Sequence, residues 1–229
     1  MNQDQSSEIQ KKFFKLFSKT FFMQFEKYGA LIGCFDEKNF NERQSYGLVV
    51  TSLMGMKGLD FVLTEVGMVR NGDGEDKKSS GRVDYLIGFG GWLFLIELKL
   101  KFAGLKNTAS ESSSCADAWD AKASGVVSQL KGITCAKNPV LRNIISERKY
   151  KGVVKLPMLI VMYAPFSIEN ILSDEVKEKV KGRHRTIASQ LMCTFKNGCR
   201  TLENPISRKH TNKKGGKQWR TTYGVGIMG

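Results

Sequence analysis

Long hydrophobic runs are missing from this sequence. No stretch of about 18 apolar residues occurs among its 229 residues, and a membrane-spanning helix needs such a stretch. The N-terminal residues MNQDQSSEIQKKFFKLF do not combine a basic segment with a following apolar core, so no secretory signal peptide is expected. Both absences predict an intracellular, cytoplasmic protein that does not insert into membranes.

Patterns of cysteine and histidine that bind metals are also scarce. The five cysteines form no CxxC pair, which argues against a zinc ribbon and leaves reduced thiols as the expectation. Only His184 and His210 are present, too few for the paired set that a histidine-metal nuclease would need. Both lie in basic stretches, so their expected role is at most contact with phosphate.

Positive charge is what the chain has in excess. Thirty-six Lys and Arg residues face 22 Asp and Glu residues, giving a formal net charge of +14. Such a field attracts polyanions, with nucleic acid as the first expectation and an anionic membrane surface as the second. Hydrophobic residues make up 41% and charged residues 25% of the chain, as in ordinary globular domains.

The chain has no internal repeats and no convincing boundary, so we expect one domain over residues 1–229. Phenylalanines at helical spacing predict an amphipathic helix at about 7–28, which would pack on its own domain or a partner subunit more readily than on a membrane. A second helix is predicted over 39–55, with Tyr46 on its apolar face. Glu42 lies one turn before Tyr46 and would point towards the core.

Four segments then have the composition of strands. Gly90-Gly91 predicts a tight hairpin turn between two of them, and the Gly-rich stretch 71–81 is expected to be a loop. A helix over 115–133 and another starting near Ser173 follow the hairpin. The basic segment from about 183 to 229 could end in a hairpin. The four strand segments are 59–69, 82–89, 92–102 and 156–166, the last one typical of a strand buried on both faces.

The third strand segment, WLFLIELKLKF, carries charges where an apolar strand would not need them. Glu97, Lys99 and Lys101 alternate along it and therefore share one side. Burying a carboxylate and an ammonium without a partner is costly. A sheltered site that faces a metal ion and a phosphate would explain them, whereas the alternative is a set of surface ion pairs.

The second strand segment brings a further carboxylate, Asp84. With a two-residue turn, Phe89 faces Trp92 and Asp84 falls opposite Glu97. Two convergent carboxylates with several waters are a normal Mg²⁺ site, in which Mn²⁺ would substitute. Lys99 would then orient or deprotonate the attacking water, or neutralise charge in the transition state.

These residues and their order resemble the PD-(D/E)xK nuclease superfamily. The resemblance implies an α/β fold with a restriction-endonuclease-like αβββαβ core and a mixed central sheet at about 39–166, together with an extra N-terminal helix and a basic C-terminal extension. In such a core Asp84 and Glu97-Leu98-Lys99 match the motif, Glu42 fits the acidic position on the first core helix, and Gln129 fits a position on the helix after the third strand. Val83 stands where the motif has proline, which removes no ligand.

Further residues are candidates for contact with DNA, which the resemblance implies is double-stranded. Glu65 could join the acidic cluster, although an ordinary charge on a strand face is the stronger expectation. Arg82 would pair with a phosphate or with Glu65. The C-terminal cations suit backbone contact, or equally a solvated tail. The candidate cations are Arg82, Lys101, Lys122, Lys209, Lys213, Lys214 and Arg220.

The expected activity is Mg²⁺-dependent hydrolysis of DNA phosphodiester bonds by an endonuclease. It could serve a restriction-type or nicking enzyme in phage defence or mobile-element conflict. A Holliday-junction resolvase is an alternative, and a homodimer through the Phe-rich first helix would suit both. From other classes, a non-catalytic DNA-binding protein on the same fold and a membrane-surface protein stay open.

Overall fold

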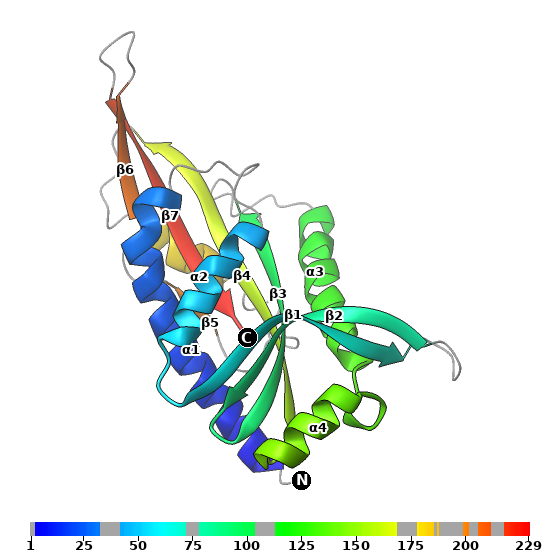
Figure 1. Ribbon diagram of the computed structural model, residues 1–229. Helices are drawn as coiled ribbons and strands as arrows, with labels where there is room; N and C mark the ends of the chain where they lie inside the picture. Colours follow the sequence, from blue (N-terminus) through cyan, green and yellow to red (C-terminus); the bar gives the residue numbers. More distant parts are fainter. Residues whose placement is uncertain are drawn as a thin grey trace.

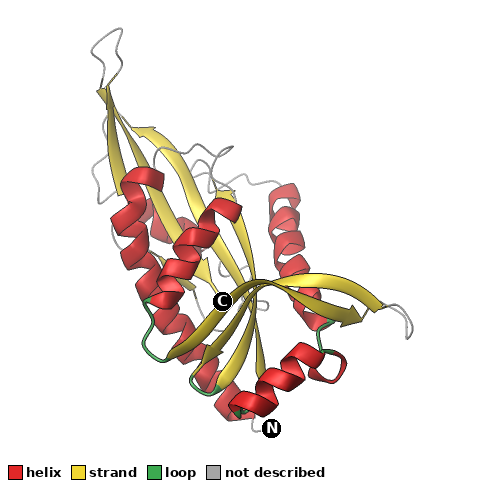
Figure 2. Cartoon of the chain, in the orientation of Figure 1, coloured by secondary structure: helices red, strands yellow, loops and turns green. Residues whose placement is uncertain are grey.

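The computed structural model describes residues 3–32, 42–71, 78–103, 113–168, 178–185, 187, 199–201, 206–211 and 218–229. These residues form a mixed α/β structure in which helices lie on both sides of one sheet (Figure 2). Within the described ranges, no helix combines the length and the apolar character needed to cross a bilayer.

The sheet is mixed. Its strands are joined in the order β1-β2-β3-β4-β7-β5, and β6 pairs with β7. β3 and β4 run parallel, whereas the other pairs are antiparallel. The bounds are β1 Leu59–Asn71, β2 Lys78–Phe89, β3 Trp92–Ala103, β4 Val153–Ile168, β5 Cys199–Thr201, β6 Ile206–Thr211 and β7 Gln218–Met228.

Two pairs of helices cover the two faces (Figure 1). α1 (Gln3–Ile32) and α2 (Glu42–Met54) pack on one face, and α3 (Ser113–Lys131) and α4 (Pro139–Arg148) on the other. The short 3₁₀ helix η1 (Cys135–Lys137) joins α3 to α4, and residues 178–185 are also helical. The even-numbered residues of β3 from Phe94 to Leu100 belong to the first core, and Leu93 and Leu95 to the second.

α1 owes its position to its phenylalanines. Phe13, Phe17 and Phe21 are at most 1% exposed, and the Phe13 ring stacks on that of Phe94 in β3 with centroids 4.5 Å apart. Packing of this helix on its own domain, one of the two expected arrangements, is therefore confirmed for these rings.

The hairpin turn is as expected. Gly90 and Gly91 have φ values of 57° and 76°, which suit a primed two-residue turn, and Phe89 pairs with Trp92. Because both residues need positive φ, glycine is favoured at each.

Three expectations were wrong or incomplete. Residues 78–81, expected within a loop, belong to β2. α4 and η1 were not expected, although Val140, Leu141, Ile144 and Ile145 have the spacing of an amphipathic helix. Pro139 occupies the first turn of α4, where proline is tolerated. The C-terminal segment is more than a hairpin, since β7 pairs with β4 and places Ile227 in the core.

Candidate functional site

The site lies where β2 separates from β3. The ladder between these strands runs from the Phe89–Trp92 pair to the Tyr85–Ile96 pair, so Asp84 and Glu97 stand next in register, as expected. There the Asp84 carboxylate takes the place of a cross-strand backbone partner: its Oδ2 accepts the Leu98 N–H at 2.7 Å. We call Asp84, Glu97 and Lys99 the fork site.

Tyr46 fixes the second oxygen of Asp84. Its hydroxyl donates to Oδ1 at 2.8 Å from α2, on the other side of the hairpin from α3. The Tyr46 ring also packs edge-on against that of Tyr85, with centroids 5.5 Å apart. Asp84 is therefore 8% exposed, and hydrogen bonds hold both of its oxygens, which defines the orientation of the carboxylate.

The β1–β2 pair is irregular next to Asp84. Between the Thr64–Tyr85 and Val66–Val83 pairs the ladder passes over Glu65 and Asp84. Glu65 has a φ of 54°, a left-handed conformation that is rare for a side chain inside a strand. Val83 and Leu86 both belong to the core under α3 and α4, although residues three apart point to opposite faces of a regular strand. The alternation of faces in β2 therefore shifts by one residue between them. Such strain inside a strand is frequent at functional sites.

Glu97 is the most buried carboxylate of the fork site, at 3% exposed. Lys99 Nζ donates a hydrogen bond to Oε1 at 3.4 Å, and Arg70 NH2 lies 3.9 Å from Oε2. Burial raises the pKa of Glu97 to about 7, and the charge of Asp84 adds to the rise, although Lys99 and Arg70 act against it. Loss of contact with water is thus the main cause of the raised pKa of Glu97.

Of the five residues expected to act in catalysis, three come together. Asp84, Glu97 and Lys99 form the fork site. α2 begins at Glu42, but the Glu42 side chain lies outside the described residues. Gln129 lies half-buried on α3, and its Oε1 is buried with no hydrogen-bond partner among the described residues.

The expected DNA-contacting cations have different outcomes. Lys101 is half-buried on β3, and the side chain of Lys122 on α3 lies outside the described residues. Arg82 pairs with Glu65 at 3.5 Å, with 71% and 44% of the two side chains exposed, so Glu65 does not join the acidic cluster. Lys209 and Arg220 are register partners in β6 and β7, whereas Lys213 and Lys214 lie outside the described residues.

His184 is not part of a phosphate-contacting surface. It is 1% exposed, and burial lowers its pKa to about 4. Its ring occupies the space beside Gly226 in β7, where an added Cβ would lie 2.2 Å from the ring. The basic sequence around His184 suggested a surface, but the residue packs on the sheet. His210 belongs to β6, and its side chain lies outside the described residues.

Two residues of this neighbourhood were missed. Tyr46 was assigned to the apolar face of its helix, and its hydroxyl gave no signal of a carboxylate partner. Arg70 follows the segment expected to end at Val69, so it was not considered. Its position two residues after the buried Met68, on the same side of β1, is the signal that could have found it.

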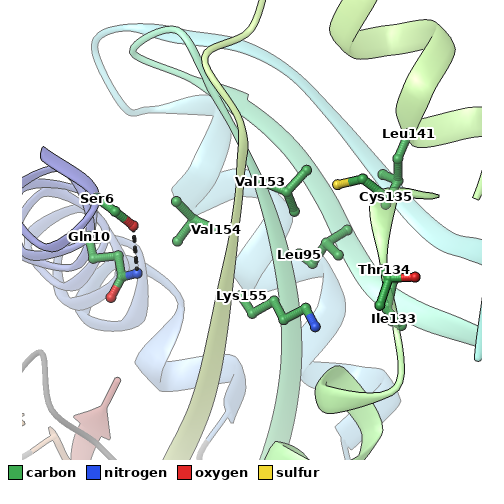
Figure 3. A pocket seen from close by; sticks show the side chains of 10 residues that line it. All are labelled: Ser6, Gln10, Leu95, Ile133, Thr134, Cys135, Leu141, Val153, Val154 and Lys155. Carbon is green, nitrogen blue, oxygen red and sulfur yellow. Dashed lines mark hydrogen bonds between the residues drawn. The ribbon is translucent and has the colours of Figure 1, made fainter. Parts of the chain in front are cut away.

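A separate cavity of about 410 Å³ lies around the first residues of β4 (Figure 3). Ser6 and Gln10 of α1 line one side of it, and Cys135 and Leu141 the other. Lys155 Nζ donates to the backbone oxygen of Lys131 there, at 3.1 Å. None of the fork-site residues lines this cavity.

Comparison with known proteins gives no family for this chain. No protein-family model, no curated protein and no solved structure matches it.

Proposed function

We propose that this protein is a Mg²⁺-dependent DNA endonuclease with a restriction-endonuclease-like αβββαβ core, in which α2, β1, β2, β3, α3 and β4 are the core elements. One observation carries the proposal: at the end of a paired hairpin, two buried carboxylates, Asp84 and Glu97, meet a lysine whose Nζ is 3.4 Å from Glu97. This arrangement resembles the D…ExK motif of the PD-(D/E)xK nucleases, and the strands that carry it follow one another in the order that the resemblance implies.

The donor set suits a hard divalent cation. Carboxylate oxygens are the ligands that Mg²⁺ prefers, and it commonly takes only one or two of them with waters. Glu97 Oε2 is buried and makes no hydrogen bond among the described residues, so it has lone pairs to offer. Within the described ranges, no three His, Cys, Asp or Glu side chains gather as a metal-binding group, and the described ligands would be Asp84 and Glu97. Glu42 would be a third.

Each residue of the fork site then has a distinct task. Asp84 is held by Tyr46 and by the Leu98 N–H, which fixes the direction of its carboxylate before substrate arrives. Lys99 projects beside Glu97, where its ammonium group can orient the attacking water and neutralise charge that develops on the phosphate. Gln129 would orient Lys99 or a phosphate. When bound, Mg²⁺ would supply Lewis-acid stabilisation of that charge, and Mn²⁺ would substitute.

DNA is the proposed substrate because charge and resemblance favour it together. The net charge of +14 would hold a polyanion by contacts to its backbone. Lys101 continues the line of cations along β3 beyond Lys99, and Lys209 and Arg220 add two register partners in the β6–β7 hairpin. A Holliday junction is the alternative substrate, since the same charges would hold branched DNA.

Digestion of a supercoiled plasmid beside a four-way junction, with Mg²⁺, with Mn²⁺ and with chelator, tests the proposal. We expect plasmid cleavage with either metal and none with chelator, whereas preferential cutting of the junction would favour the resolvase. Asp84→Ala, Glu97→Ala and Lys99→Ala should each abolish cleavage and retain DNA binding in a gel-shift assay. Cleavage at the wild-type rate by the triple variant would disprove the site, and binding without any cleavage by the wild type would favour a non-catalytic DNA-binding protein.

A further inference from the structure

Arg70 reaches the fork site from β1, a strand that contributes none of the three fork-site residues. It lies near the end of β1, and its guanidinium extends across β2 towards β3, where NH2 is 3.9 Å from Glu97 Oε2. The same nitrogen donates to the backbone oxygen of Arg82 in β2. The side chain is 19% exposed, so a molecule entering from solvent can still touch it.

Gly81 makes this crossing possible. A Cβ at residue 81 would lie 2.7 Å from Arg70 Nε and 2.8 Å from its Cζ, closer than any real side chain allows. Arg70 is register partner of Ser79, and Gly81 of Met68, so Arg70 runs diagonally over a β2 position that has no side chain. An arginine at residue 70 and a glycine at residue 81 therefore act as a pair.

The guanidinium is not fully used by the protein. Its Nε is buried and has no hydrogen-bond partner among the described residues, and 3.9 Å to Glu97 is an ion-pair distance rather than a hydrogen bond. An unfilled donor in a sheltered place costs free energy. A planar guanidinium is suited to the tetrahedral oxygens of a phosphate, because arginines bind phosphate through parallel hydrogen bonds.

We propose that Arg70 is a catalytic residue that binds a non-bridging oxygen of the scissile phosphodiester, and that Gly81 is the opening through which it reaches that oxygen. This inference rests on the proposed nuclease function. A purely local role, in which Arg70 only balances the charge of Glu97, makes different predictions for metal binding and for cleavage.

A double-mutant cycle with plasmid DNA separates these roles. The variants are Arg70→Gln, Gly81→Ala and the two combined, with Arg142→Gln as the matched control because Arg142 is an exposed arginine on α4. The rate is measured at saturating Mn²⁺, and Mn²⁺ affinity is measured by titration without DNA. Gly81→Ala keeps the arginine and displaces only its flexible end, so it reports on Arg70 even if Arg70→Gln folds poorly.

We expect Arg70→Gln to lower kcat/KM by about 100- to 1,000-fold, as loss of a donor to the transition state does. Gly81→Ala should lower it at least tenfold, and the double variant should be no slower than Arg70→Gln alone. Mn²⁺ affinity should not fall in any variant, and Arg142→Gln should match the wild type.

Three results would overturn the inference. Cleavage by Arg70→Gln within threefold of the wild type, with tighter Mn²⁺ binding, would show that Arg70 only offsets the charge of Glu97. Additive losses from Arg70→Gln and Gly81→Ala would show that the two residues act separately. A wild-type protein that cleaves no DNA with either metal would overturn the proposed function and this inference together, so the two failures are distinguishable.

Discussion

The two halves of the β2–β3 hairpin differ in almost every respect. In the turn half, residues 85–96, the strands pair from Phe89–Trp92 to Tyr85–Ile96 and their large side chains are apolar and buried. In the fork half the ladder stops, Asp84 and Glu97 are buried, and β1 carries a left-handed residue at Glu65. The turn half has the regular pairing and the buried apolar side chains of a stable hairpin. The fork half departs from both beside the fork-site residues, and such departures are common at functional sites.

Replacing Glu97 by glutamine should show the difference between the two halves most clearly, because it should affect cleavage and not stability. We expect at least about a thousandfold loss of cleavage, because the amide can neither balance a divalent cation nor pair with Lys99. The melting temperature of the metal-free protein should not fall, since the change removes a buried charge and preserves shape. Glu147→Gln, an exposed change on α4, is the control; equal cleavage by both variants would contradict the assignment.

Phe94→Ala is the corresponding change in the turn half. Phe94 is 0% exposed and contacts the rings of Phe13 and Phe89, so its truncation should cost about 3–5 kcal/mol of unfolding free energy. Denaturant titration measures that loss. The fraction that stays folded should cleave DNA normally, and a loss below about 1 kcal/mol would show that the α1 face is not the main core.

The backbone at Glu65 offers a smaller test of the strain in the fork half. Glu65→Val places a β-branched residue at positive φ, and Glu65→Gly relieves the conformation, so the two variants should differ by about 1–2 kcal/mol in stability. Both lose the exposed pair with Arg82, which contributes little. Equal stabilities in denaturant titration would mean that residue 65 is not held in the left-handed region.

The pH dependence of the metal-free protein should be the smallest effect, because two shifts oppose each other. Glu97 has its pKa raised from 4.5 to about 7, so its contribution is present below pH 4.5 and is lost as pH rises through 7. His184 has its pKa lowered from 6.5 to about 4, so its contribution is present above pH 6.5 and is lost as pH falls through 4.

Between pH 4.5 and 6.5 these two trends cancel in part. Unfolding of the wild type and of Glu97→Gln by denaturant, with chelator and over this pH range, isolates the glutamate. The stability of the wild type relative to the variant should fall as pH rises from about 4.5 to 7. A constant difference would show that the pKa of Glu97 is not raised.

The regular half of the hairpin was predictable from sequence because its signals are local. Gly90-Gly91 determine the turn, the turn determines the register, and the register places Asp84 opposite Glu97. The four strand segments and the first two helices follow from hydrophobic periodicity, which reports burial directly.

The remaining features depend on contacts between distant parts of the chain. The left-handed φ of Glu65 has no signature in a glutamate, and the diagonal path of Arg70 over Gly81 joins residues eleven apart on two strands. The burial of His184 follows from a glycine in β7, which lies far along the sequence. The sequence of β7 belongs to a basic C-terminal segment, and its place in the sheet depends on its pairing with the distant strand β4.

Titration of Mn²⁺ into chelator-treated protein tests most directly whether the fork site binds a divalent cation. The wild type, the Asp84→Asn/Glu97→Gln double variant and Glu147→Gln should be compared by electron paramagnetic resonance of the free ion. We expect saturable binding by the wild type and by Glu147→Gln, and loss of that binding in the double variant. Equal binding by all three proteins, or none by the wild type, would contradict the assignment of Asp84 and Glu97 as metal ligands.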